Sequence, residues 1–488
     1  MIFLWNWVGD KMRICIIAEG SYPYVTGGVS SWIQSMIKDM PEHEFIIYAI
    51  SPEKKQRGQF KYELPKNLIE VRESFLDSYL EEKVRWGRKF KLTHEEKRNV
   101  KSLLGSEGEM DWSAFIRMVR SARFNNVSDF LTSRDFYDIL RELCEEHYPL
   151  VPFTEMFWTV RSMILPLLII IREDLPEADL YHSVSTGYAG IIGAVAKEVY
   201  AKPFLLTEHG IYSREREEEI IKAEWVKGYF KDLWIHYFYR LSSSAYNGAD
   251  CVTTLFSRNK EIEVELGCPE DKIKIIPNGV SVTDYVELPS TKPNNEFYIG
   301  AIVRIVPIKD IKTMLQSFAI IKQQLPNAVF YIMGPTEENE AYFEECVQLV
   351  NALELKDVIF TGLVPIKDYI GKMDVLMLTS ISEGQPLAIL EGMAAGKPFV
   401  ATDVGSCREL LEGLDDGIGP SGLVVPVMHY EQLANAAVKL CKDEKLRLEM
   451  GTNAFQRVER FYQHEEVIRN YRSVYETIGG GKDGGHWL

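Results

Sequence analysis

Residues 375–398 read VLMLTSISEGQPLAILEGMAAGKP, and this order of apolar, polar and small residues decides the class of the fold. The apolar run 375–379 predicts a buried strand. After a polar loop comes Pro386, which suits the first turn of a helix because its missing N–H is harmless there. A strand that leads directly into a helix is the repeating unit of a parallel α/β sheet.

The same alternation extends in both directions, and the chain of 488 residues is longer than one hydrophobic core usually organises. In the first half we expect strands at 13–17, 45–50, 180–183, 203–207, 250–254 and 273–276, with a helix at 29–40. In the second half we expect strands at 297–303, 329–333, 358–360, 375–379, 398–401 and 423–426, with a helix at 310–325 and helical chain from 430 to about 477. The prediction is an α/β protein of two Rossmann-like domains, with ligands at the carboxyl ends of the strands and between the domains.

Two interruptions set the expected domain boundaries. The strand rhythm fails at 51–178, where charged helical patterns such as 81–101 predict a mostly helical insertion into a first domain, 12–285. A proline- and asparagine-rich stretch at 282–296 reads as a linker, so a second domain is expected at 296–453.

Composition excludes several classes of protein. A net charge of −16 argues against nonspecific binding to nucleic acid or anionic lipid. Seven scattered cysteines without a C-x-x-C pair favour reduced core residues in a cytoplasmic protein. The longest apolar run, 163–171, contains a proline and predicts a buried helix, and residues 1–8 lack the basic leader of a signal peptide.

The loop and helix after 375–379 carry the first candidate site. The free amides of Leu387 and Ala388 at a helix N-terminus suit a diphosphate. Glu383 precedes the helix and Glu391 lies in its second turn, so one carboxylate can meet a donor sugar while the other accepts hydrogen bonds from ribose hydroxyls. Each glutamate alone also fits a solvated position on a helix.

Cations and glycines follow other predicted strands. Arg304 and Lys309 come after strand 297–303 and can offset the charge of a leaving diphosphate, although a surface pair flanking a loop fits equally. Gly27 and Gly28 end a strand-to-helix loop and allow close approach of a phosphate or sugar, or simply make a tight turn. His209 follows strand 203–207 and can hydrogen-bond a sugar hydroxyl, or serve a structural role.

Several motifs are missing from the sequence. No D-x-D pair occurs to hold a divalent ion on a nucleotide sugar, so we expect no metal and no other cofactor, with Arg304, Lys309 and the helix end in the metal's place. There is no G-x-G-x-x-G, no P-loop and no G-x-S-x-G elbow, which disfavours nicotinamide binding, nucleotide hydrolysis and ester hydrolysis.

Taken together, these motifs and Pro277-Asn278-Gly279-Val280 resemble the retaining family 4 glycosyltransferases, which have the GT-B fold of two Rossmann-like domains facing across a cleft. The resemblance implies that Arg304 and Lys309 bind the donor diphosphate. It also implies that the donor is contacted by Gly27, Gly28, His209, Val364, Glu383, Gly384, Pro386, Leu387, Ala388 and Glu391. Among these, it implies that Glu383 contacts the transferred sugar and Glu391 the ribose, and that Val364 lies near the base. It also implies that the last helix, 454–478, returns to the first domain.

A narrower similarity lies in residues 19–32, EGSYPYVTGGVSSW, which resemble the opening of the PelF subfamily of exopolysaccharide transferases. It implies a UDP-sugar donor, UDP-glucose by preference, a saccharide acceptor, and peripheral association with an inner-membrane synthase complex through protein partners. Two other functions stay open: a nucleotide-sugar epimerase or phosphorylase on the same scaffold, and a UDP-sugar-binding regulator without turnover.

Overall fold

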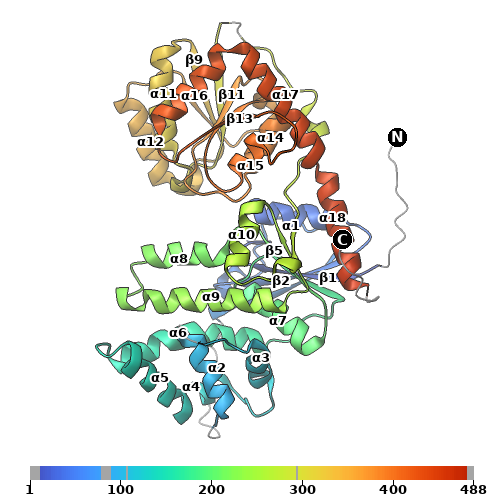
Figure 1. Cartoon of the computed structure of the whole chain (residues 1–488), viewed down its shortest axis with the longest axis vertical. Helices are drawn as coiled ribbons and strands as arrows, with labels where there is room; N and C mark the ends of the chain where they lie inside the picture. The colour runs from blue at the N-terminus through green and yellow to red at the C-terminus, as the bar shows by residue number, and fades with distance from the viewer. Residues whose placement is uncertain (1–10, 78–89, 106–107, 293–294, 481–488) are drawn as a thin grey trace. The chain divides into compact units, whose positions relative to one another are not determined.

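The computed structural model describes residues 11–77, 90–105, 108–292 and 295–480, which form two compact units (Figure 1). The first unit comprises Met1–Thr254, Lys260–Ile275 and Tyr471–Leu488, and the second comprises Leu255–Asn259 and Ile276–Asn470. The expected linker, 282–296, thus falls within the second unit, where η5 (Val282–Tyr285) forms a short 3-10 helix. The apolar opening, residues 1–8, lies outside the described residues.

A parallel seven-stranded sheet forms the centre of the first unit, in the order β3-β2-β1-β4-β5-β6-β7. Its strands are β1 (Arg13–Glu19), β2 (Glu44–Ser51), β3 (Leu68–Phe75), β4 (Leu180–Ser183), β5 (Phe204–Glu208), β6 (Cys251–Thr254) and β7 (Ile273–Ile275). Most are rich in isoleucine, leucine and valine and are buried on both faces, as parallel strands between helical layers are. The order reverses between β1 and β4, so the loops after these strands diverge there.

Helices cover this sheet and form a further layer. They are α1 (Gly28–Lys38), α2 (His94–Leu104), α3 (Trp112–Arg120), α4 (Val127–Leu131), α5 (Arg134–His147), α6 (Phe153–Arg172), α7 (Tyr188–Tyr200), α8 (Tyr212–Lys222), α9 (Lys231–Gly248) and α10 (Ser257–Glu265), with 3-10 turns η1 (Lys54–Gln56), η3 (Gly228–Phe230) and η4 (Glu270–Lys272). Helix α7 packs on β1, β4 and β5, whereas α2, α3 and α5 pack on α6, α7 and α9 (Figure 1).

The segment 51–178 differs from the expectation in two places. It contains β3, which pairs with β2 along its whole length and extends the sheet. Of the expected helix 81–101, residues 81–89 lie outside the described residues. In the described part, 90–93 are not helical, and α2 starts at His94, where Thr93 and Glu96 form a reciprocal capping box.

Helix α6 contains the apolar run 163–171 and continues past Pro166. By length and composition it is the one helix in the described residues that could cross a membrane. Half of it is buried, and Met163, Leu167 and Ile171 belong to the hydrophobic core shared with the sheet. It is therefore a core helix of the first unit, as the sequence predicted.

The second unit contains a parallel six-stranded sheet, in the order β10-β9-β8-β11-β12-β13. Its strands are β8 (Phe297–Ile302), β9 (Ala328–Met333), β10 (Val358–Gly362), β11 (Val375–Leu378), β12 (Phe399–Thr402) and β13 (Gly422–Val425). Its helices are α11 (Ile311–Gln324), α12 (Glu340–Ala352), α13 (Lys367–Ile370), α14 (Leu387–Ala394), α15 (Cys407–Glu412), α16 (Tyr430–Lys442) and α17 (Glu444–Phe461), with 3-10 turns η6 (Pro307–Lys309) and η7 (Glu337–Asn339). Helix α11 packs against α16 on one face and α14 against α17 on the other (Figure 1).

The last helix, α18 (His464–Gly479), changes unit along its length, and from Tyr471 onwards it belongs to the first unit. There the Tyr475 hydroxyl hydrogen-bonds Nδ1 of His182 at 2.8 Å, and the Tyr471 hydroxyl lies 3.2 Å from Oγ1 of Thr253. These contacts hold the end of the chain on β4 and β6.

Candidate functional site

In the second unit the sheet order reverses between β8 and β11, and the loops after these two strands carry Lys309 and Glu383. The Lys309 ammonium donates a hydrogen bond to Oε1 of Glu383, and the Ser380 hydroxyl donates to the same oxygen at 2.5 Å. Both side chains are mostly buried, with 16% of Lys309 and 9% of Glu383 exposed. Ligands of open parallel sheets bind at such a reversal, so this pair occupies the expected place for a ligand.

Backbone contacts hold the two loops together. Thr379 donates through Oγ1 to the carbonyl oxygens of Lys309 at 2.9 Å and Asp310 at 3.0 Å. The N–H of Ile381 donates to the carbonyl of Ile308 at 2.9 Å. Since the loops are fixed by their backbones, the side chains of Lys309 and Glu383 are positioned before any ligand arrives.

Gly405 supports this loop, and the sequence analysis missed it. Its φ is +52°, and a Cβ there would lie 2.3 Å from the carbonyl oxygens of both Glu383 and Gly384. The next residue, Ser406, donates its N–H to the Gly384 carbonyl at 3.0 Å. The signal was the pair Gly405-Ser406 in the loop that follows β12, and its role is evident only from the contact between the two loops.

Helix α14 begins one residue later than predicted. Pro386 is the N-cap, with ψ at 114°, and the first helical residue is Leu387. A proline disfavours helical geometry in the residue before it, here Gln385. Pro386 itself is also extended, so the helix starts only after it. The amides of Leu387 and Ala388 remain at the start of the helix, where the helix dipole favours an anion.

Glu391 lies in the second turn of α14, mostly buried. Burial raises the pKa of its carboxyl, and a hydrogen bond from the Tyr285 hydroxyl and the charge of Lys367 oppose that rise. Glu391 therefore faces η5 and does not contact the Lys309–Glu383 pair through any hydrogen bond in the described residues.

Arg304 follows β8 but is half exposed, and it pairs with Glu338 at 2.5 Å. It makes no ion pair with Glu383 in the described chain, so the structure does not join the four second-domain residues into one cluster. Gly334 follows β9 directly and packs against the end of β8. Glycine is needed for this close approach, because a Cβ at Gly334 would lie 1.9 Å from the carbonyl oxygen of Val303. Val364, two residues beyond β10, is partly exposed at the same edge of the sheet.

Gln385 is buried and turns away from the loop surface. Its Oε1 accepts a hydrogen bond from the N–H of Asn278 at 2.5 Å, and its Nε2 has no partner in the described part of the chain. The side chain thus ties the Pro277-Asn278-Gly279 segment to the start of α14.

In the first unit the corresponding reversal lies between β1 and β4, and Gly27 and Gly28 follow β1 at the start of α1. Both are exposed, and a Cβ added to either would meet nothing within 4 Å. Protein packing therefore does not require glycine here, and the space above them is open to a ligand.

His209 follows β5 and lies with its ring 4.7 Å from that of Trp32, edge to face. Its Nε2 is buried without a hydrogen-bond partner in the described residues. Burial lowers the pKa of His209 to about 4, so the imidazole is neutral at physiological pH. A neutral ring with an unpartnered nitrogen is equipped to hydrogen-bond a ligand.

Two glutamates beside these residues were not predicted. Glu19, at the end of β1, accepts hydrogen bonds from the Tyr212 hydroxyl at 3.0 Å and the Ala189 N–H at 3.2 Å. Glu208 accepts from the Tyr246 hydroxyl at 2.6 Å, and burial raises its pKa to about 7. Both glutamates hydrogen-bond residues of the loops and helices around His209. In the sequence, the only indication of this role was a carboxylate at the end of a buried strand.

Comparison with known families decides the relationship of this chain. A model described as "Domain of unknown function (DUF3492)" matches residues 12–271, more than half of the chain, and one described as "Glycosyl transferases group 1" matches residues 288–457. The chain belongs to the DUF3492 family, and its residues 288–457 form a segment that matches the group 1 glycosyltransferases. The group 1 segment contains Arg304, Lys309, Val364, Glu383 and Glu391, whereas Gly27, Gly28 and His209 lie in the DUF3492 segment.

The curated relatives of this chain carry different names. It is 27% identical over 223 residues to the N-acetyl-alpha-D-glucosaminyl L-malate synthase of Bacillus anthracis, an alignment that covers 44% of this chain and 56% of the relative. It is 24% identical over 340 residues to the capsular polysaccharide biosynthesis glycosyltransferase CapM of Staphylococcus aureus, covering 66% of this chain and 82% of the relative. The chain thus spans little more than half the length of the first relative.

Among solved structures, the chain is similar to Anabaena HepE in complex with UDP and glucose, with a TM-score of 0.58 and 16% identity over 96% of this chain and all of the other. At this identity the likeness shows the fold. The predicted α/β fold class, two Rossmann-like domains of the GT-B type, is confirmed.

Proposed function

We propose that the chain is a retaining, metal-independent glycosyltransferase that transfers a sugar from a UDP-sugar, with UDP-glucose favoured, to a growing exopolysaccharide of the Pel type. The observation that carries the proposal is the buried Lys309–Glu383 pair at the strand reversal of the group 1 segment. A lysine suits a diphosphate and a carboxylate suits sugar hydroxyls, and here the two are fixed side by side.

Three features suit the donor's diphosphate. Lys309 supplies a partly buried positive charge, Arg304 supplies an exposed guanidinium able to hold two oxygens at once, and the start of α14 supplies the free amides of Leu387 and Ala388. The sequence lacks a D-x-D motif, so we assign to these groups the charge compensation that a divalent ion would supply elsewhere. Transfer is therefore expected to persist in excess EDTA.

The carboxylates suit the sugar and the ribose. Both protein hydrogen bonds to Glu383 reach Oε1, which leaves Oε2 for a hydroxyl of the transferred sugar. Glu391, mostly buried beside Tyr285, is assigned to the ribose hydroxyls. Val364 and Gly384 are assigned to the base and phosphate through backbone contacts, at the same edge of the sheet.

In the first unit we assign His209 to a sugar hydroxyl, through its neutral imidazole, and the open space above Gly27 and Gly28 to a close approach of the ligand.

Transfer with retention is then a front-face step. The bond from the anomeric carbon to the phosphate oxygen breaks, the acceptor oxygen bonds to that carbon on the same face, and the departing phosphate oxygen takes the acceptor's proton. The protein contributes orientation and stabilises the leaving diphosphate.

The product and location rest on similarity. Residues 19–32 resemble the PelF subfamily, and the alignment with a relative named for capsular polysaccharide biosynthesis covers 66% of the chain. We therefore place the enzyme in the cytoplasm, at the inner membrane through a polysaccharide synthase complex.

A donor screen tests the proposal. Purified chain is titrated with UDP by calorimetry and incubated with UDP-glucose, UDP-N-acetylglucosamine and UDP-N-acetylgalactosamine, and free UDP and sugar products are measured. Glu383→Ala is expected to bind UDP but not to release it from any UDP-sugar. Glu345→Ala, which removes an exposed ion pair with Lys312, is the control. Failure to bind UDP refutes the proposal, epimerised UDP-sugar points to an epimerase, and binding without turnover points to a regulator.

A further inference from the structure

A pocket lies wholly within the first unit, between helix α6 and the segment that joins α8 to α9. It has a volume of about 510 Å³, within the range of ligand-binding sites. The residues that line it are Thr154, Glu155, Trp158, Thr159, Ser162, Trp225, Val226, Lys227, Phe230 and Trp234. All of them belong to the DUF3492 segment and none to the group 1 segment.

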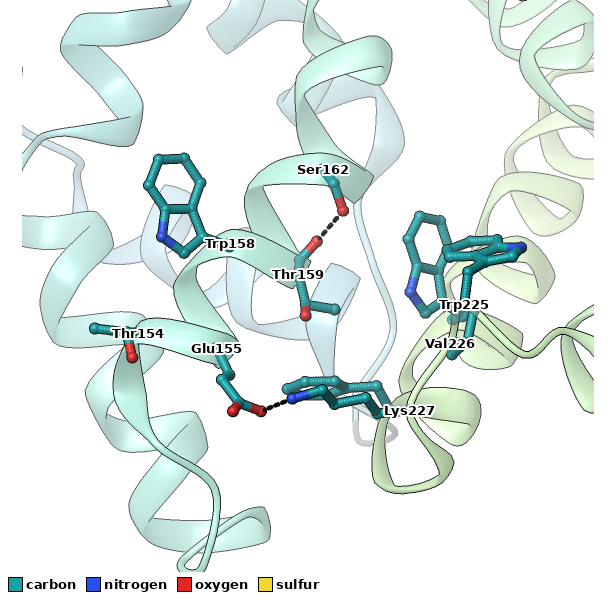
Figure 2. Close-up of a pocket in the computed structure, with 10 residues that line it drawn as sticks. Thr154, Glu155, Trp158, Thr159, Ser162, Trp225, Val226 and Lys227 are labelled. Atoms are coloured by element: carbon teal, nitrogen blue, oxygen red, sulfur yellow. Dashed lines mark hydrogen bonds and ion pairs between the residues drawn. The ribbon is translucent and has the colours of Figure 1, made fainter.

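Two tryptophans of this pocket are unusually exposed. Trp158 is 60% exposed and Trp225 is 70% exposed, and in Figure 2 their rings lie on either side of Thr159 and Ser162. Trp225 packs edge to face on the buried Trp234, with ring centroids 5.5 Å apart. The Arg161 guanidinium lies over the Trp158 ring, 5.4 Å from its centroid. Each exposed ring is thus held by a protein contact on one side and is open to a ligand on the other.

Polar groups lie between the aromatic rings. The exposed face of α6 presents the hydroxyls of Thr154, Thr159 and Ser162, because these residues lie on the same side of the helix. The Ser162 hydroxyl donates to the Thr159 carbonyl at 2.7 Å and can still accept a hydrogen bond. The Trp158 and Trp225 indole N–H groups have no hydrogen-bond partner in the described residues.

Charge at the pocket is balanced. Glu155 and Lys227 form an ion pair at 2.8 Å, the only charged groups among the lining residues, and the pair closes one end of the pocket in Figure 2. The hydrogen bond from Lys227 lowers the pKa of Glu155, so both groups are charged at neutral pH. The lining residues therefore offer no unpaired cation for a phosphate, and the neighbouring Arg161 guanidinium stacks on the Trp158 ring.

We propose that this pocket binds a short segment of a neutral saccharide chain, with Trp158 and Trp225 stacking on sugar rings and the α6 hydroxyls bonding to sugar hydroxyls. One face of a pyranose ring carries several C–H groups, which are attracted to the electron-rich face of an indole, while its hydroxyls require polar partners. A lipid surface fits less well, because insertion of the tryptophans would also bury three hydroxyls and an ion pair. The choice of a saccharide rests on the proposed transfer to a polysaccharide.

Calorimetry on the full chain tests this pocket with maltohexaose, cellohexaose and N-acetylated chitohexaose as probes. At least one is expected to bind, and Trp158→Ala and Trp225→Ala are each expected to weaken binding about tenfold. Trp225→Phe keeps a smaller ring and is expected to fall between. Leu150→Ala removes a side chain that is 97% exposed and does not line the pocket, so it should leave binding unchanged.

UDP binding, measured on the same samples, separates this inference from the proposed function. If saccharide binding is lost in the tryptophan variants while UDP binding is intact, both stand. If no hexasaccharide binds, or if binding is unchanged in both alanine variants, the pocket assignment is wrong whatever UDP does. If vesicles of phosphatidylcholine and phosphatidylglycerol bind instead, and the tryptophan variants lose them, the pocket is a membrane contact and the inference is overturned. Saccharide binding without UDP binding supports the pocket and refutes the donor assignment.

Discussion

The Lys309 ammonium hydrogen-bonds Oε1 of Glu383 and so joins the loops that follow β8 and β11, the neighbouring strands at which the second sheet reverses its order. In the proposed reaction this lysine holds the departing diphosphate and the glutamate holds the sugar. Each side chain keeps its partner oriented until the donor binds.

Lys309→Ala is expected to lower kcat by about 10²- to 10³-fold, because the leaving diphosphate loses a positioned cation. The measurement is UDP release at saturating donor. Lys312→Ala is a matched control, since Lys312 lies three residues away and forms an exposed pair with Glu345. Equal activity of the two variants would remove Lys309 from the leaving-group role.

Gly405→Ala is expected to abolish UDP binding, because the new Cβ would collide with the Glu383 and Gly384 carbonyls at 2.3 Å. Gly417→Ala is the control: it also has a positive φ, +74°, but its Cβ would meet nothing within 4 Å. The control should lose only about 1–2 kcal/mol of unfolding free energy from backbone strain. Thermal unfolding and calorimetry report the two effects separately, and normal UDP affinity in Gly405→Ala would contradict the role of this loop.

UDP affinity is expected to fall as the pH drops through the raised pKa of Glu391, because the protonated carboxyl has lost hydrogen-bond acceptor capacity for the ribose. The stability of the free protein should respond in the opposite sense at this group. Burial disfavours its charged form, so the folded state binds the extra proton and gains stability as the pH falls. In Glu391→Gln this part of the pH dependence of UDP binding should disappear.

His209 is expected to stay neutral from about pH 5 upwards, because its pKa is about 4. The pH profile of transfer should therefore contain no inflection near pH 6.5 that arises from His209. Substitution of His209 should leave the shape of the profile near pH 6.5 unchanged. His209→Ala should lower transfer about tenfold, the value of one hydrogen bond to a sugar hydroxyl. NMR titration of the imidazole checks the protonation directly, and a midpoint near 6.5 would contradict the burial argument.

Tyr475→Phe is expected to destabilise the first unit by about 1–3 kcal/mol, because Nδ1 of the buried His182 loses its partner. Thr477→Ala, on the same helix, is the control. Burial lowers the pKa of His182 to about 3, so the stability that its neutral form contributes is present above pH 6.5 and is lost as the pH falls towards 3. Denaturant unfolding at several pH values measures both effects.

The sequence determined the order of strands and helices to a large extent. The stretch 180–183 was predicted as a strand with the bounds that β4 has, although only Leu180 and Tyr181 in it are apolar. The edge strand β3 escaped prediction, since Leu68–Phe75 is half polar and becomes a strand only by pairing with β2. Residues 90–93 of the expected helix 81–101 are not helical, because the capping box of Thr93 and Glu96 fixes the N-terminus of α2 at His94.

The sequence by itself also identified the residue types of the candidate site, since Lys309 and Glu383 stand in strand-to-helix loops, and Glu391 in the helix that follows, of a recognisable family. Only the tertiary structure decided their partners: Lys309 with Glu383, Arg304 with Glu338, and Glu391 beside Tyr285. The requirement for Gly405 and the pocket between Trp158 and Trp225 likewise come from segments distant in the chain. Local patterns encode which element forms, whereas contacts across the fold depend on packing that no single stretch of sequence contains.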